Sequence, residues 1–186
     1  MISIKPKKGM LLIAEPSIAG DLSFTRSVIL VADHSEKGSI GFILNKELEF
    51  TLQDLLPDLK KNFKVYNGGP VEQDNLYFIH NVPEMIPNSI EISDGIFWGG
   101  NFETVQSLIE QDSISDKQIK FFLGYSGWDG DQLMEELNAN SWVAIKNEDQ
   151  QNIIANSNSS IWKRKMQELG GDYLIWSNAP ENPSYN

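Results

Sequence analysis

Hydrophobic residues form short, nearly continuous runs in the first quarter of the chain. Residues 10–14 (MLLIA), 27–32 (SVILVA) and 39–45 (SIGFILN) are of this kind, and short apolar runs rich in β-branched residues are typical of buried strands. The polar segment 33–38 (DHSEKG) separates the second run from the third. We therefore predict three strands here, with a turn at 33–38 that joins the last two as an antiparallel pair.

Later strand signals are separated by turn residues. The dipeptide Asp94–Gly95 favours a tight hairpin, and Gly124, Gly127 and Gly130 predict a turn between a strand and a helix. Further strands are predicted at 64–66, at 76–80, on both sides of the hairpin within 89–98, at 119–123 and at 142–145, with weaker signals at 153–154 and 173–176.

Helical spacing or helix start signals appear in three or four places. Thr51 and Asp54 have the spacing of a capping box before a short apolar segment. Asn101 is the expected N-cap of a helix whose apolar face begins at Phe102. Two more helices are predicted at 133–137 and 161–169, the second ended by the pair of glycines at 170–171.

The order of these elements indicates the fold class. Strands and helices do not alternate strictly, and no linker divides the hydrophobic segments. We therefore predict a single α+β domain over residues 1–176, with a mixed, mostly antiparallel sheet and three or four flanking helices. Residues 177–186 are rich in Pro and Asn, which predicts a disordered tail.

The composition of the chain limits the classes of molecule that it is expected to bind. The 186 residues include 15 Lys and Arg against 26 Asp and Glu, which gives a net charge of −11, and no cysteine. Such a charge opposes direct binding to nucleic acid or to an anionic membrane surface. No stretch approaches the roughly 20 apolar residues of a membrane span. We expect a soluble cytoplasmic protein whose partner is a small molecule or another protein.

Ser126 invites comparison with a hydrolase nucleophile. Residues 124–128 read G-Y-S-G-W between a predicted strand and a predicted helix, whereas the nucleophile elbow requires G-x-S-x-G. A serine nucleophile also needs a base, and the two histidines, His34 and His80, both precede Ser126. A turn with a capping or ligand-facing hydroxyl is favoured, and a serine hydrolase is the alternative.

The other candidates are an isolated cation and glycine turns. Arg26 precedes a strand in an acidic chain and would bind an anion or pair with a carboxylate such as Asp21 or Asp94. The donor set fits no common metal or cofactor motif, so none is expected. The candidate ligand-binding residues are Arg26, His34, Asn45, Gly68, Gly69, Asp94, Gly99, Gly100, Ser126 and Trp128.

Taken in order, these motifs resemble the bacterial AlgH/YqgE family. The match is carried by GMLLIAEP at 9–16, FTRSVIL at 24–30, VYNGGPV at 65–71, DGIFWGG at 94–100 and FFLGYSGW at 121–128. Residues 129–133 (DGDQL) depart from the family pattern, which is closer to G-P-G-Q-L. The resemblance implies a sheet curled towards a pseudo-barrel and no established catalytic activity. Members are often labelled transcriptional regulators.

Three functions follow as hypotheses. The leading one is a non-enzymatic binding domain with an indirect regulatory role, because no catalytic set assembles in the sequence. The alternatives are a hydrolase that uses Ser126 and a regulator that binds DNA directly. The net charge of −11 opposes the last of these.

Overall fold

One branched sheet dominates the computed structural model, which describes residues 5–16 and 21–181. The strands are β1 (Leu11–Ala14), β2 (Val28–Ser35), β3 (Gly38–Ile43), β4 (Glu47–Thr51), β5 (Lys64–Asn67), β6 (Val71–His80), β7 (Ile90–Ser93), β8 (Ile96–Trp98), β9 (Ile119–Asp129) and β10 (Trp142–Ile145). The α-helices are α1 (Leu52–Leu55), α2 (Phe102–Glu110), α3 (Gln132–Asn138), α4 (Ile153–Asn156), α5 (Ile161–Leu169) and α6 (Tyr173–Asn178), and a short 3₁₀ helix, η2 (Gln150–Asn152), precedes α4.

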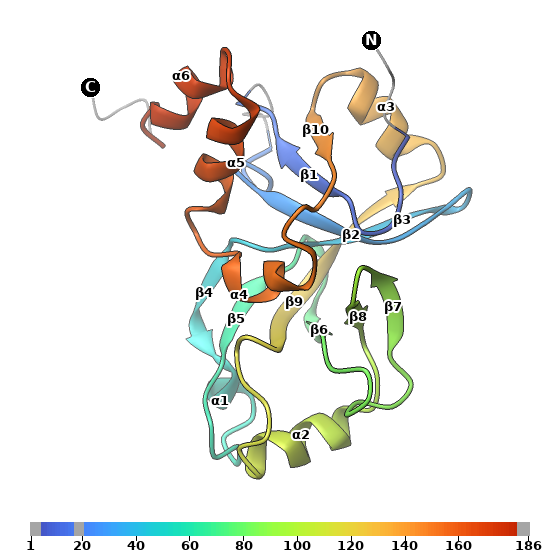
Figure 1. Cartoon of the computed structure of the whole chain (residues 1–186), viewed down its shortest axis with the longest axis vertical. Coiled ribbons are helices and arrows are strands. Elements are labelled where there is room, and N and C mark those ends of the chain that lie inside the picture. Colours follow the sequence, from blue (N-terminus) through green and yellow to red (C-terminus); the bar gives the residue numbers. More distant parts are fainter. Residues whose placement is uncertain (1–4, 17–20, 182–186) are drawn as a thin grey trace.

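Strand β9 joins the two halves of the molecule (Figure 1). The main path of the sheet is β10-β1-β2-β3-β9-β6-β8-β7, and β4 and β5 branch from it. The second half of β9 pairs with β3, while its first half pairs with β5 and β6. Only the β5–β9 pairing is parallel among the described strands. The predicted α+β class with a mostly antiparallel sheet is therefore confirmed, although the sheet does not close into a barrel.

The N-terminal strands read as continuous apolar runs because both faces of the sheet are covered. Leu11 and Ile13 of β1 belong to a core cluster with Trp162 of α5, whereas Leu12 lies in a cluster with Leu133 of α3 on the opposite face. Successive side chains of a strand point to opposite faces. In Figure 1 α3 and α5 accordingly lie on different sides of β1 and β2.

The other half of the sheet is packed against α2. The Asn101 side chain accepts a hydrogen bond from the Thr104 N–H at 2.8 Å, which confirms the predicted N-cap. Val105 and Ile109 then face a cluster that includes Phe121 of β9. The Thr51–Asp54 capping box of α1 is also present, as are the predicted antiparallel β2–β3 pair and the β7–β8 hairpin.

The predicted turn at 124–130 is wrong, because β9 continues through it to Asp129. Gly124 adopts a φ of +70° inside the strand, opposite an irregular register between Val71 and Leu76 of β6. A glycine in the left-handed region makes a bulge here and does not end the strand. The predicted turn at 33–38 is likewise shorter, since β2 and β3 pair as far as Ser35 and Gly38.

Two short apolar segments predicted as weak strands are helical. Residues 153–154 begin α4, and residues 173–176 lie in α6. The described chain thus has six α-helices where three or four were predicted, and it has a strand, β4, that its mostly polar sequence did not indicate. Helix α6 includes the first two residues of the predicted tail, and 182–186 lie outside the described residues. No helix among those described is long and apolar enough to cross a membrane.

Candidate functional site

Ser126 and the first glycine turn meet at a tightly packed crossing. The Ser126 hydroxyl is fully buried and donates a hydrogen bond to the Gly68 carbonyl at 3.1 Å. A Cβ on Gly69 would lie 2.2 Å from the Tyr125 carbonyl oxygen. The backbones therefore fill the space between these residues, and the Ser126 hydroxyl is occupied by an internal partner.

Neither histidine lies beside the Ser126 hydroxyl. His34 lies on β2, which β3 separates from β9, and its Nδ1 contacts the Ser39 hydroxyl of β3 at 2.8 Å. His80 pairs with Ile119, at the other end of β9, which places it roughly 20 Å from Ser126 at the usual rise per residue. Its Nδ1 accepts from the Val82 N–H, so its Nε2 carries the proton toward the Gly99 carbonyl. Among the described residues, no histidine is therefore paired with Ser126.

The remaining glycine turns and their neighbours lie apart from one another. Gly99 and Gly100 line an aromatic cavity of about 400 Å³ beside α2. Asp94 and Gly95 both have positive φ angles, as the tight β7–β8 hairpin requires. His34 borders a separate cavity of about 240 Å³. The sequence did not say whether these turns converge, and in the structure they do not form one site.

Trp128 is held inside the core next to α3. Its indole N–H donates to the Glu136 carboxylate at 2.8 Å, and the indole of Trp142 donates to the same oxygen at the same distance. The side chain is almost fully buried. The contacts of Trp128 therefore anchor α3 to β9.

Arg26 and Asn45 do meet, at the edge of a cavity of about 410 Å³. Asn45 is buried and donates to the Arg26 carbonyl. The Arg26 guanidinium lies 5.0 Å from the centre of the Trp162 ring and donates to the Ala179 carbonyl at 2.7 Å. It forms no ion pair with Asp21 or Asp94, the partners suggested by the sequence.

Lys46 adds a second cation to the same cavity. Its ammonium donates to the Thr25 carbonyl, and among the described residues no carboxylate lies within ion-pair distance of Arg26 or Lys46. Burial lowers the pKa of Lys46; Glu181 opposes this shift, and the Arg26 charge adds to it. Glu47 and Glu181 also line this cavity, beyond ion-pair distance of the two cations. Two cations that repel each other without a close carboxylate partner favour the binding of an anion.

Lys120 is one of the residues that line a second cavity, which has a volume of about 450 Å³. Its side chain extends from β9, is only 5% exposed, and donates to the carbonyl and to the hydroxyl of Ser157, the latter at 2.9 Å. The ammonium also lies 3.7 Å from the centre of the Tyr66 ring. Burial lowers the pKa of Lys120 to about 7, with Glu47 opposing the shift and Lys64 adding to it.

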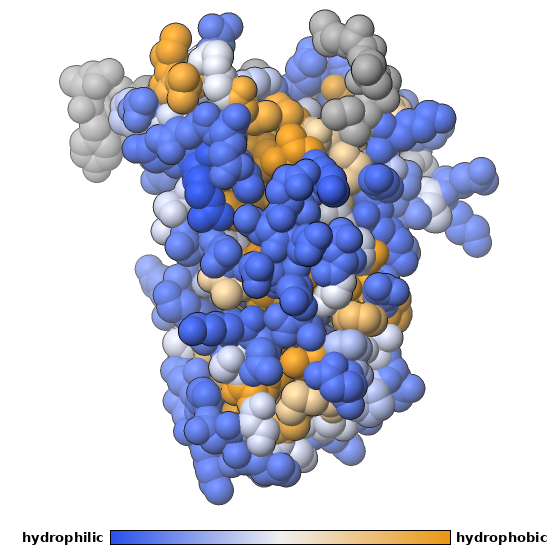
Figure 2. Space-filling view, viewed as in Figure 1, coloured by the Kyte–Doolittle hydropathy of each residue, from blue (hydrophilic) through white to orange (hydrophobic). Residues whose placement is uncertain are grey.

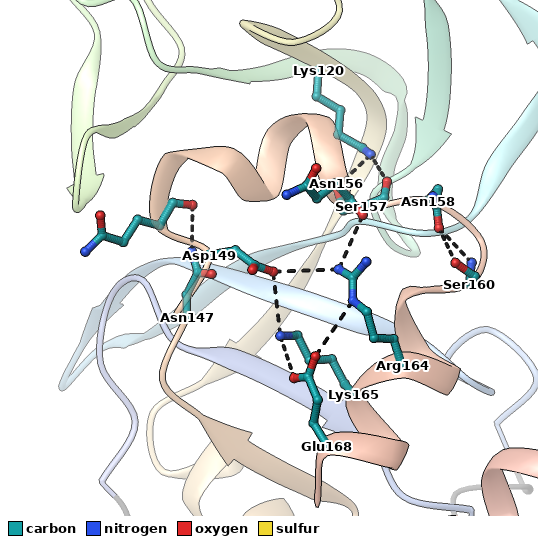
Figure 3. Close-up of polar contacts among 11 residues, drawn as sticks. Lys120, Asn147, Asp149, Asn156, Ser157, Asn158, Ser160, Arg164, Lys165 and Glu168 are labelled. Atoms are coloured by element: carbon teal, nitrogen blue, oxygen red, sulfur yellow. Dashed lines mark hydrogen bonds and ion pairs between the residues drawn. The ribbon is translucent and has the colours of Figure 1, made fainter.

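A second buried lysine shows what is unusual about Lys120. Lys165 is 4% exposed, and its ammonium forms ion pairs with Glu168 at 2.8 Å and with Asp149 at 3.6 Å (Figure 3). The figure also shows Lys120 contacting only Ser157 among the residues drawn. A buried charge is normally paired, and among the described residues Lys120 has no carboxylate at that distance.

The two cavities adjoin. Ser157 and Asn158 line the Lys120 cavity, and the next two residues line the Arg26 cavity. Across from them, Lys64 and Glu47 form a 3.0 Å ion pair, with one member in each cavity. We call these two cavities together, from Arg26 and Lys46 to Lys120, the cationic cleft. Figure 2 shows hydrophilic residues over the middle of this face, where α4 lies.

Sequence reasoning found Arg26 and Asn45 but missed Lys46, Lys120 and Tyr66. One signal was available for Lys120, because it is a charged residue within the apolar run IKFFL at 119–123. No group of three or more His, Asp or Glu side chains in the described chain is arranged to hold a metal ion.

The sequence matches a known protein family and near full-length relatives. The model of the AlgH-like family (DUF179) matches residues 11–174. A UPF0301 protein of Bacteroides thetaiotaomicron is 38% identical over 186 residues, covering 99% of this chain and 93% of the relative. One of Cytophaga hutchinsonii is 38% identical over 181 residues, covering 96% and 98%.

Two solved structures share the fold. A crystal structure of a Corynebacterium diphtheriae protein superposes with a TM-score of 0.77 at 21% identity, over 96% of this chain and 95% of the other. The solution structure of the AlgH protein from Pseudomonas aeruginosa gives a TM-score of 0.70 at 23% identity, over 97% and 98%. The family match and the near full-length relatives together show that the chain belongs to the AlgH-like UPF0301 family.

Proposed function

We propose that this protein is a non-enzymatic binding domain that takes up a small anionic molecule in the cationic cleft and acts as an indirect regulator. The observation that carries the proposal is the pair Arg26 and Lys46. The two cations share one cavity with Glu47 and Glu181, but among the described residues no carboxylate lies at ion-pair distance from either cation. An incoming carboxylate or phosphate would supply the missing countercharge. The cytoplasmic location expected from the sequence remains part of the proposal.

The acidic character of the chain supports a small ligand over a polyanion. With a net charge of −11, a long nucleic acid would be repelled by the surface around the cleft. A compact anion can enter the cavity and contact the two cations while it leaves that surface untouched. We therefore expect selectivity for small anions and no direct role in DNA binding.

The test is thermal unfolding in the presence of inorganic phosphate, pyrophosphate, oxalate and succinate, against sodium chloride of equal ionic strength. A ligand present at about 100 times its dissociation constant stabilises the fold by roughly 2.7 kcal/mol. For a domain of this size that corresponds to an increase in Tm of about 5–10 °C. We expect at least one of these anions to give such a shift.

Lys46→Met should remove most of this shift, whereas Lys60→Met, which removes the same charge from an exposed position, should retain it. An equal shift in both variants would place the anion elsewhere. If no anion stabilises the wild-type protein more than chloride does, the proposal is wrong. A short DNA duplex that binds tightly at moderate salt would instead favour the nucleic-acid alternative.

A further inference from the structure

We infer that Lys120 is a nucleophile that forms a reversible imine with a small carbonyl compound bearing an anionic group. The inference rests on the proposed function in one respect, because the Arg26 and Lys46 charges of the neighbouring cavity would attract the anionic group of this ligand. Its own basis is the cavity beside Lys120, where a buried amine lies next to apolar side chains in a lining that is otherwise polar. Phe63, Ile119 and Ile154 form the apolar part of this lining.

The hydrogen bonds of Lys120 suit the neutral amine. A neutral amine has two N–H groups, and Ser157 offers two acceptors, its carbonyl and its hydroxyl. With both N–H groups engaged, the nitrogen lone pair is free to attack a carbonyl carbon. The Tyr66 ring face favours the ammonium form, but burial outweighs it and lowers the pKa of Lys120 to about 7.

The charged groups around Lys120 favour neither the neutral amine nor the ammonium form strongly. Glu47 of β4 and Asp116 before β9 carry negative charge, and Lys61 and Lys64 carry positive charge. Residues 153–158, which cover the cavity from the other side, include no titratable side chain. Burial therefore remains the main influence on Lys120.

The chemistry balances without a further reactant. The amine lone pair attacks the carbonyl carbon, one proton passes from nitrogen to the former carbonyl oxygen, and a carbinolamine forms. Loss of water from the carbinolamine then gives the imine, and hydrolysis reverses both steps. The Ser157 hydroxyl, 2.9 Å from the nitrogen, is placed to exchange the proton. The product is a ligand held covalently but reversibly, as a sensor requires.

Lys120 should react much faster than an exposed lysine. At pH 7 about half of its amine is neutral, whereas an ordinary lysine is neutral only about once in two or three thousand molecules. Even though a less basic amine is intrinsically a weaker nucleophile, we expect at least a tenfold preference for Lys120 over exposed lysines such as Lys60 and Lys117.

The test is reductive trapping followed by peptide mapping. The folded protein is incubated at pH 7 with glyoxylate, an aldehyde that carries a carboxylate, and with propionaldehyde as the uncharged comparison. Sodium cyanoborohydride then reduces any imine to a stable secondary amine. We expect the modification on the peptide that contains Lys120, more with glyoxylate than with propionaldehyde. Peptide mapping separates this product from modification of the N-terminal amine.

The first control for the trapping experiment uses the wild-type protein and needs no variant. The same trapping in denaturant should spread over all lysines, since unfolding removes the environment of Lys120. Lys120→Met should lose the selective product, and Lys60→Met should retain it. Modification of the exposed lysines with Lys120 unmodified in the folded protein would overturn the inference, as would equal rates at Lys120 and Lys117.

The outcome is separable from that of the proposed function. Phosphate contains no carbonyl group, so stabilisation by phosphate that depends on Lys46, combined with unmodified Lys120, would retain the anion site and reject the imine. Selective trapping at Lys120 without any stabilisation by anions, and with equal yields from glyoxylate and propionaldehyde, would retain the nucleophile and reject the anion site.

Discussion

Burial of the Lys120 ammonium carries a desolvation cost that contacts with neighbouring groups offset only in part. Two acceptors on Ser157 and the Tyr66 ring replace water around the charge, but among the described residues no carboxylate compensates it at ion-pair distance. Lys165 is buried to the same degree and has two carboxylates beside it. The cost at Lys120 is therefore a property of this position, and it should be measurable as a dependence of stability on pH.

We predict that Lys120→Met stabilises the protein at pH 6 and that the gain shrinks as the pH rises. Between pH 7 and 10.5 the unfolded chain holds a proton on Lys120 that the folded chain has released, so wild-type stability rises with pH in this window. A shift from 10.5 to about 7 bounds the effect at about 5 kcal/mol. Urea unfolding at pH 6, 8 and 10 measures it.

Lys165→Met is the matched control, because it removes a lysine of equal burial that is ion-paired. It removes the buried ammonium from Asp149 and Glu168, which keep only their longer contacts with Arg164 at 3.6 and 3.8 Å, so it should destabilise the protein at pH 6. If Lys120→Met destabilised the protein at pH 6 by as much as Lys165→Met, the interpretation of Lys120 as an uncompensated charge would be wrong.

The sequence showed Lys120 only as an oddity within an apolar run. Whether a lysine in a strand is exposed or covered depends on the segment that packs over it, and that segment, with Ser157, comes 37 positions later. Residues 146–160 are mostly polar, and the weak strand signal at 153–154 within them pointed to neither β5 nor β9. Arg26 was easier to find, because it is the only Lys or Arg between Lys8 and Lys37.

At the scale of elements, the contact between residues 68–69 and β9 determines how the branches of the sheet meet. Gly68 donates to the Leu123 carbonyl at 2.9 Å, and its own carbonyl accepts from Ile43 and from the Ser126 hydroxyl. The glycines at these positions are therefore explained by close packing of backbones, which the sequence presented only as a turn.

We predict that Gly69→Ala destabilises the fold by about 2–6 kcal/mol. Gly69 has a φ of +152°, and its new Cβ would lie 2.2 Å from both the carbon and the oxygen of the Tyr125 carbonyl. Backbone strain and overpacking each contribute about 1–3 kcal/mol. Chemical unfolding measures the difference. Gly130→Ala, where φ is +41° and no atom lies within 4 Å of the new Cβ, should cost only about 1–2 kcal/mol; equal losses would contradict the packing argument.

Agreement of two local signals located α5 to the residue, whereas two short apolar segments with a single signal were assigned to the wrong kind of element. Helix α5 begins at Ile161 and ends at Leu169 as expected, because helical spacing and the following glycines agree. Residues 153–154 and 173–176 are short apolar segments that fit either a strand or a helix, and packing decides between them. Tyr173 illustrates this, since its hydroxyl donates to Glu15, far away in the sequence, at 2.6 Å.

At the scale of the whole molecule, β9 couples the two halves. Its first residues pair with β6 and β5 in the half that contains α2, and its last residues pair with β3 in the half that contains α5 (Figure 1). Phe122 of β9 also packs against Phe42 of β3 at a ring separation of 5.0 Å. This coupling could not be predicted while 124–130 was interpreted as a turn, because a turn would have ended the strand before it reached β3.

A continuous strand through both halves predicts that they unfold together. Phe121→Leu leaves a small cavity in the half that contains α2 and should cost about 1–2 kcal/mol. Amide hydrogen exchange under native conditions should then accelerate, about 5- to 30-fold, for the most protected peptides of both halves, including β1 and β2. Leu55→Ala, at an exposed position of α1, should leave the exchange rates in both halves unchanged. If Phe121→Leu accelerated exchange only in the peptides around α2, the halves would be separate cooperative units. The cationic cleft is lined by α5 from one half and by β5 from the other. A ligand bound there would then stabilise the two halves unequally.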